Sequence, residues 1–216
     1  MVKKQKKFKE IFQKYLEKGI KLERWQKIGI LFLVIVFSGF FGWVYEFIFY
    51  FFDGGMKEWY MQGGNLLPWI NIYAIGAVLI IVATYKIRKY PWAIFLVSII
   101  VAGIIEFLGG WLVYTVGNGT RYWDYNVEIL NFGNIGGFVC LRSIMFFGIS
   151  ALFLVYIIVP GCICLAQKMS KRAFLTLAIS LFALVMLDEV VNLTLKNSGL
   201  PTAMDFYESL GLKYRY

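Results

Sequence analysis

The sequence predicts an all-α integral membrane protein of about five transmembrane helices, preceded by a basic amphipathic helix at the membrane surface. Of the 216 residues, 60% are hydrophobic and 19% are aromatic, which is more than a soluble domain of this size can bury in one core. Several apolar runs reach the length of about 20 residues that crosses a hydrocarbon layer. The net charge of +9 is concentrated ahead of the first of these runs.

The basic amphipathic helix is expected over residues 1–27, which carry ten Lys and Arg residues. Phe8, Ile11, Tyr15 and Ile20 recur between the lysines at helical spacing. Such a helix lies in the plane of the membrane and faces anionic head groups. It would anchor the chain and set its topology, or dock a cytoplasmic partner.

Five spans follow, at 28–52, 68–85, 92–116, 143–165 and 173–195, so the transmembrane domain covers 28–195 and a short extracytoplasmic tail covers 196–216. The second span is the weakest because Pro68, Asn71 and Gly76 lie in its first turns, and part of it is a candidate re-entrant loop. Sixteen Lys and Arg residues flank the spans on the N-terminal side and five on the other. This asymmetry predicts a cytoplasmic N-terminus.

Composition also excludes several function classes. The basic charge belongs to a membrane-surface segment, so no nucleic-acid partner is expected. The chain has no His, and its three cysteines do not form a ligand set, so neither a metal site nor a cofactor is predicted. No GxxxxGK[ST] phosphate loop is present. An ATPase, if one is used, would be a separate cytoplasmic protein.

Several charged residues interrupt the predicted spans. Counting at 1.5 Å per residue, Glu46 lies about 9 Å and Glu106 about 15 Å below the outer span ends. Asp188 and Glu189 occupy the outer half of the last span, and Arg142 begins the fourth. Each costs roughly 2.5 to 3.5 kcal/mol in hydrocarbon. Ion pairs of Arg142 with Glu46 or Glu106 would explain some of them, but the surplus acid favours a cavity open to the outside.

Two outer loops, 53–69 and 117–137, could cover such a cavity or form re-entrant loops. The second holds Trp123, Asp124 and Tyr125, which are either part of an interfacial aromatic belt or part of a pocket. Gly109 and Gly110 follow Glu106 closely and indicate room for a neighbouring helix.

The residues around these acids resemble a known family. Gly42-Trp43-Val44-Tyr45-Glu46, Ile105-Glu106-Phe107, Trp123-Asp124-Tyr125 and Asn134-Ile135-x-Gly137 occur in the order and spacing of the bacterial type IV ABC-transporter permease family. The resemblance covers about 37–160 and departs at Asn71-Ile72-Tyr73-Ala74, where the family has Pro-Ile-Tyr-Gly. It implies a multi-pass protein of the bacterial cell membrane with a role in transport.

Placement and resemblance together nominate nine solute-binding residues: Tyr45, Glu46, Tyr73, Glu106, Trp123, Asp124, Tyr125, Asn134 and Arg142. We expect a permease-like subunit with an outward-facing site for a small polar or cationic solute. It would act in the lipid bilayer, alone or with the separate ATPase, and a homodimer could supply a missing wall. The alternatives are a non-catalytic scaffold or sensor, and an enzyme acting on a lipid head group through paired carboxylates. No catalytic residue is assigned.

Overall fold

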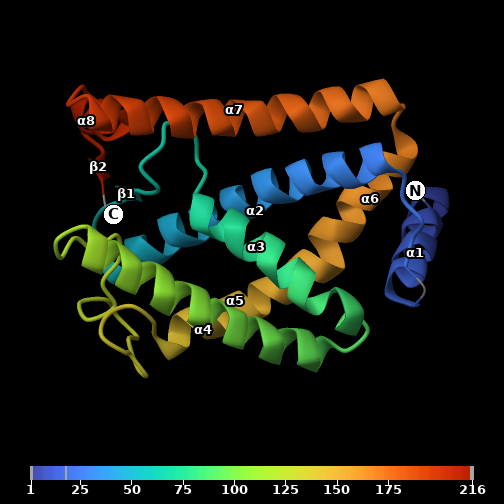
Figure 1. Cartoon of the computed structure of the whole chain (residues 1–216), viewed down its shortest axis with the longest axis horizontal. Helices are drawn as coiled ribbons and strands as arrows, with labels where there is room; N and C mark the ends of the chain where they lie inside the picture. Colours follow the sequence, from blue (N-terminus) through green and yellow to red (C-terminus); the bar gives the residue numbers. More distant parts are fainter. Residues whose placement is uncertain (1, 18, 215–216) are drawn as a thin grey trace.

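The computed structural model describes residues 2–17 and 19–214 and shows a helical bundle (Figure 1). Its elements are α1 (Val2–Glu17), α2 (Arg24–Asp53), β1 (Tyr60–Met61), α3 (Asn71–Thr84), a 3-10 turn (Tyr85–Ile87), α4 (Pro91–Val116), α5 (Leu141–Phe153), a π-helical turn (Leu154–Ile158), α6 (Val159–Lys168), α7 (Lys171–Asn197), α8 (Ala203–Ser209) and β2 (Lys213–Tyr214). The all-α membrane fold is confirmed. Lys18 and Arg215, both counted in the charge asymmetry, lie outside the described residues.

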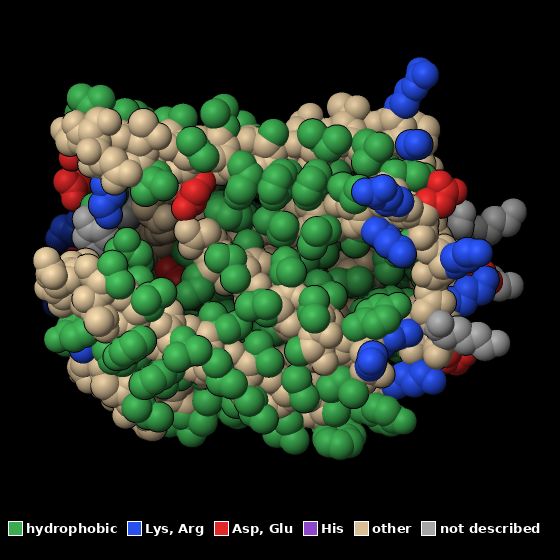
Figure 2. Space-filling model, viewed as in Figure 1, with side chains coloured by type: hydrophobic (Ala, Val, Ile, Leu, Met, Phe, Trp, Pro, Cys, Tyr) green, Lys and Arg blue, Asp and Glu red, His purple; other side chains and the backbone are tan. Residues whose placement is uncertain are grey.

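Four helices are long and apolar enough to cross a membrane, namely α2, α4, the continuous α5–α6 and α7. They run between two ends of the molecule. We call the end with α1 and the turns at 85–90 and 168–171 the basic end, and the end with the loops at 54–70 and 117–140 the loop end. Figure 2 shows Lys and Arg side chains gathered at the basic end and a broad hydrophobic surface between the ends.

The amphipathic helix is shorter than predicted. It ends at Glu17, and the chain turns at Gly19, whose φ of +73° favours glycine. Helix α2 then starts at Arg24 behind a capping box formed by Glu23 and Gln26. Figure 1 shows α1 running across the basic end of the bundle. Its buried Ile11 and Tyr15 join the main core, so its apolar side packs on protein.

Arg88 fastens α1 to this end of the bundle. Its side chain is buried, and its Nε donates to the backbone oxygen of Tyr15 at 2.5 Å while Nη1 donates to that of Tyr85 at 2.5 Å. The backbone oxygen of Arg88 accepts from the hydroxyl of Tyr156 at 2.9 Å. One arginine therefore links the C-terminal turn of α1 to the turn between α3 and α4.

The second predicted span is the one that differs most. It becomes α3 with its 3-10 turn, Asn71–Ile87, which is shorter than the four long apolar helices, and the chain at 63–68 before it is a series of bends. Segment 62–70 nevertheless enters the bundle, because Trp69 is buried and its indole nitrogen donates to the oxygen of Ile35 at 3.3 Å. The amide of Ile70 donates to the oxygen of Gly39 at 3.2 Å. Ile35 and Gly39 lie near the middle of α2, so segment 62–70 reaches that depth as a re-entrant stretch.

The apolar core occupies the basic half of the bundle. Its largest cluster includes Leu33 of α2, Ile80 of α3, Ile94 of α4, Val155 of the π-helical turn and Phe174 of α7. The α5–α6 helix bends within this region at a π-helical turn just before Pro160, a residue that cannot donate the regular backbone hydrogen bond. The main apolar cluster therefore lies toward α1, and polar side chains gather in the loop-end half.

Candidate functional site

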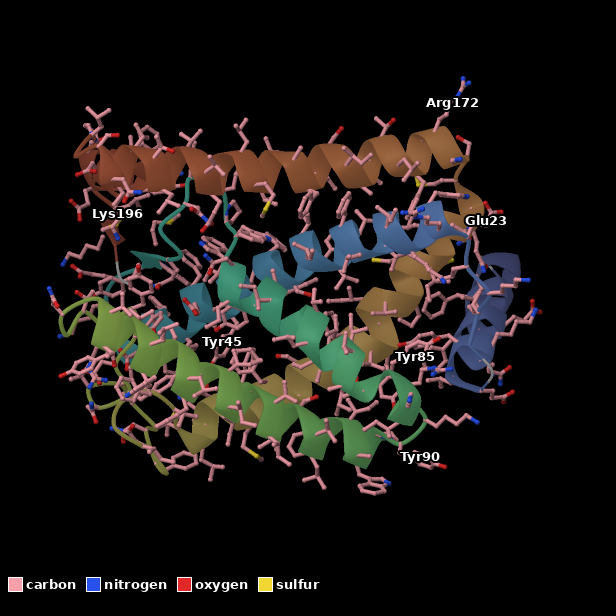
Figure 3. All side chains as sticks on the ribbon, in the orientation of Figure 1. Glu23, Tyr45, Tyr85, Tyr90, Arg172 and Lys196 are labelled. Atoms are coloured by element: carbon pink, nitrogen blue, oxygen red, sulfur yellow. The ribbon has the colours of Figure 1, made fainter. Side chains whose placement is uncertain are left out.

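A cavity of about 440 Å³ lies in the loop-end half of the bundle. Side chains from α2, α3, α4, α5 and α7 and from both long loops line it. Figure 2 shows acidic atoms within a hollow between α7 and α4. In Figure 3, Lys196 extends from the last turn of α7 toward the interior of the molecule. Among the described residues, the cavity is bordered by four glutamates, Glu46, Glu106, Glu128 and Glu189, but by only two basic residues, Arg142 and Lys196.

Helix α2 places Glu46 on the cavity wall. Its Oε1 accepts a hydrogen bond from the hydroxyl of Tyr73, the third residue of α3, at 2.9 Å. This contact depends on Gly42, one turn earlier in α2, because a Cβ there would overlap the ring of Tyr73. The absence of a side chain at 42 thus sets the distance between α2 and α3 and brings the tyrosine hydroxyl to the carboxylate.

Glu106 of α4 is more deeply enclosed, with 5% of its surface exposed. Its Oε1 accepts from the hydroxyl of Ser143 at 2.5 Å and from that of Tyr125 at 2.6 Å. Its Oε2 is enclosed and has no hydrogen-bond partner among the described residues. Two neutral hydroxyls therefore surround this carboxylate, and no described cation forms an ion pair with it.

Arg142 pairs with Glu128, which the sequence did not single out. The Nη2 to Oε2 distance is 2.5 Å, and the hydroxyl of Tyr50 donates to Oε1 of Glu128 at 2.9 Å. The alternative that Arg142 pairs with Glu46 or Glu106 is not seen among the described residues, because the 117–140 loop folds back and brings its own acid to the start of α5. Burial raises the pKa of the Glu128 carboxyl, and the nearby guanidinium opposes this rise.

Asp188 and Glu189 of α7 hold the re-entrant segment. The carboxylate of Asp188 accepts from the amides of Leu66 at 3.2 Å and Leu67 at 2.7 Å. That of Glu189 accepts from the side chains of Asn65 at 2.7 Å and Asn71 at 2.8 Å. Non-helical backbone at membrane depth persists only where protein satisfies its polar groups. These two acids supply that satisfaction, so their hydrogen bonds have a structural role.

Aromatic rings form much of the remaining cavity wall. Tyr45 lies between α2 and its neighbours (Figure 3) and stacks on Phe146 of α5 with ring centroids 3.4 Å apart. The guanidinium of Arg142 lies over the ring of Phe49 at 3.9 Å. Lys196 lies 5.7 Å from the ring of Tyr122. These rings present apolar faces that also attract cations.

The structure brings seven of the nine nominated residues to the cavity: Tyr45, Glu46, Tyr73, Glu106, Trp123, Tyr125 and Arg142. Asp124 and Asn134 lie elsewhere and tie the 117–140 loop together. Asp124 accepts from the backbone and side chain of Asn126, and Asn134 accepts from the amide of Gly137. Their polar atoms serve the loop's own turns. Gly109 and Gly110 also face this loop, through Trp123 and Phe138, and not a neighbouring helix.

Sequence reasoning missed several residues at the cavity. Ser143 follows Arg142 directly, and Tyr50 follows Glu46 by one helical turn, which is the only sequence signal that could have indicated them. Glu128, Asn65 and Asn71 carry no such signal. Among the described residues there is no group of His, Cys, Asp and Glu that could hold a metal ion.

A comparison with family models supplies the relationship of the whole domain. The model described as "Putative ABC-transporter type IV" matches residues 31–193. The chain belongs to this family. The match extends past the 37–160 region of resemblance and takes in α7 through Leu193, with Asp188 and Glu189. No curated protein and no solved structure matches the chain.

Proposed function

We propose that this family member is a membrane subunit of a transporter that binds a small polar solute with a positively charged group in the loop-end cavity. The observation that carries the proposal is the pair Glu46 and Glu106. Both border the cavity, and neither forms an ion pair with a described residue. A carboxylate at membrane depth is costly unless it faces a partner, water or a ligand. A cationic solute would supply the missing counter-charge.

The shape of the cavity supports the same proposal. A volume of about 440 Å³ falls in the range of roughly 300 to 1,000 Å³ typical of small-molecule sites. Its walls combine aromatic rings with a few polar groups, which is the lining such sites use to orient a ligand. Tyr73 and Tyr125 each hold one of the two carboxylates through a hydroxyl, so the acids would be preorganised for binding.

Energy coupling would come from another protein. The printed sequence has no phosphate loop, and the family is named for ABC transport, so we propose a separately encoded cytoplasmic ATPase as the partner. It would dock at the basic end, where exposed Lys9, Lys14 and Lys86 lie. The proposed orientation in the bacterial cell membrane places this end, and the N-terminus, in the cytoplasm.

A scaffold function is the second candidate, and one observation favours it. The carboxylates of Asp188 and Glu189 accept hydrogen bonds from segment 62–70 and from Asn71. Part of the intramembrane acid therefore has a structural role. Glu46 and Glu106 differ because their partners are hydroxyls that stabilise but do not neutralise them. The two candidates therefore differ in what removal of those two charges does.

Binding measurements can separate them. The full chain in lipid nanodiscs would be titrated calorimetrically with small organic cations, such as choline, putrescine and ethanolamine. We expect at least one to bind, and Glu46→Gln and Glu106→Gln each to weaken it about tenfold or more. Glu58→Gln is the matched control, since Glu58 is exposed and lies outside the cavity lining. Equal affinity in all three variants would refute the proposal and leave the scaffold function.

A further inference from the structure

Two charged side chains of opposite sign border the cavity with free hydrogen-bonding groups. Oε1 of Glu46 receives the hydroxyl of Tyr73. Its Oε2 accepts no hydrogen bond from a described residue, and it is not enclosed by protein as Oε2 of Glu106 is. This oxygen is therefore open to the cavity and can receive a hydrogen bond from a ligand.

Arg142 has the complementary vacancy. Its Nη2 contacts Glu128 at 2.5 Å and Cys140 Sγ at 3.8 Å. Its Nε is enclosed without a partner, and its Nη1 donates to no described residue. Each guanidinium nitrogen can donate to an acceptor such as a carboxylate oxygen. The enclosed Nε is out of a ligand's reach, so Nη1 is the guanidinium nitrogen that remains to donate to a ligand while Nη2 holds Glu128.

The two side chains border the same cavity. Glu46 and Arg142 both line it, but they form no ion pair with each other within 4.0 Å. A solute seated between them would meet a free carboxylate oxygen on one side and free guanidinium donors on the other.

Building on the proposed cation site, we propose that the solute is a zwitterion, a small molecule with an ammonium and a carboxylate. The ammonium binds Oε2 of Glu46, and the carboxylate accepts a hydrogen bond from Nη1 of Arg142. A simple cation leaves the Arg142 donors without acceptors, which is costly in an enclosed site. A simple anion faces Glu46, Glu106 and Glu128 and is repelled. A zwitterion satisfies both sides and does not change the net charge of the site.

The test compares each zwitterion with an ester that keeps only its positive charge. The full chain in nanodiscs is titrated with the L-amino acids and glycine betaine, each beside its methyl ester. We expect at least one zwitterion to bind about tenfold or more tightly than its ester. If esters or the organic cations bind and no zwitterion exceeds its ester, the zwitterion proposal is wrong and the cation site stands. If no compound binds, both proposals fail.

Variants test whether Arg142 binds the carboxylate of the zwitterion. Removing Arg142 alone leaves Glu128 buried and unpaired, so the double variant Glu128→Gln with Arg142→Gln removes both charges together. It should lower zwitterion affinity to that of the ester and leave ester affinity unchanged. Glu128→Gln alone frees Nη2 and should raise zwitterion affinity, a direction that general loss of structure cannot produce. Glu46→Gln should weaken zwitterion and ester alike. Unchanged zwitterion preference in the double variant would overturn the assignment.

Discussion

Replacing Asp188 by alanine should release the re-entrant segment 62–70 from α7. Asp188 accepts hydrogen bonds from the backbone amides of Leu66 and Leu67 and from the side chain of Asn192. A buried donor left without a partner costs about 1 to 3 kcal/mol. Leu66 is exposed and can turn to water, whereas Leu67 is half-buried. The loss in free energy of unfolding should therefore be about 1 to 3 kcal/mol, the cost of the Leu67 amide left without an acceptor.

Thermal unfolding in nanodiscs, followed by tryptophan fluorescence, measures this loss. Trp69 is buried against α2, so its emission also reports whether segment 62–70 has left the bundle. Asp188→Asn should have a smaller effect because one side-chain oxygen remains to accept a hydrogen bond. Glu208→Ala, which removes an exposed acid from α8, is the control for charge. A midpoint for Asp188→Ala equal to that of Glu208→Ala would refute the role we assign to Asp188.

Three further predictions follow from other contacts. Gly42→Ala should destabilise the protein by about 1 to 3 kcal/mol, because the new Cβ meets the Tyr73 ring; Gly161→Ala, where nothing lies within 4 Å, should be neutral or stabilising in the same unfolding assay. Arg88→Ala should free α1 and speed proteolytic cleavage at 19–23, while Lys86→Ala, which removes an exposed cation from the same turn, should have a much smaller effect; equal cleavage rates would contradict the link through Tyr15. The exposed pair of Glu58 and Lys213 lowers the pKa of the carboxyl from 4.5 and raises that of the amine from 10.5, chiefly through their shared hydrogen bond. Pairing of the tail with β1 should therefore be strongest between the lowered carboxyl pKa and the raised amine pKa, and it should weaken as pH falls through the first or rises through the second. Glu58→Gln should remove this dependence on pH. Protease access to the C-terminal tail that does not change with pH in the wild type would contradict the prediction.

The long helices were predictable because their apolar runs leave little choice in a bilayer. The expected span 92–116 is observed as Pro91–Val116, and the expected span 173–195 as Lys171–Asn197. The break between α1 and α2 was not predictable. Gly19 and the capping box at Glu23 act over a few residues, and hydrophobic periodicity does not detect them. Helix ends depend on such local hydrogen bonds, and the average composition of a segment does not show where they form.

The arrangement of the cavity was only partly predictable. Depth along the spans indicated that Glu46 and Glu106 lie in the same half of the molecule, and both border the cavity. The partner of Arg142 was not predictable, since it depends on how the 117–140 loop folds over the start of α5. Asp124 looked like a pocket acid by its aromatic neighbours, yet its hydrogen bonds close a turn of its own loop. Long-range pairings of this kind follow from packing that no single segment encodes.

The anchoring of segment 62–70 has a consequence for biogenesis. The amide of Leu66 donates to the carboxylate of Asp188, which lies 122 residues further along the chain. Before α7 has been synthesised and inserted, the amides of Leu66 and Leu67 lack the acceptor that Asp188 supplies, and each backbone group left unsatisfied in hydrocarbon costs several kcal/mol. We therefore expect the segment to stay in the aqueous phase while the earlier helices enter the bilayer, and to move inward only when α7 arrives. Insertion of α7 would then complete the cavity. A chain that stalls before α7 would have its earlier membrane helices but no binding site.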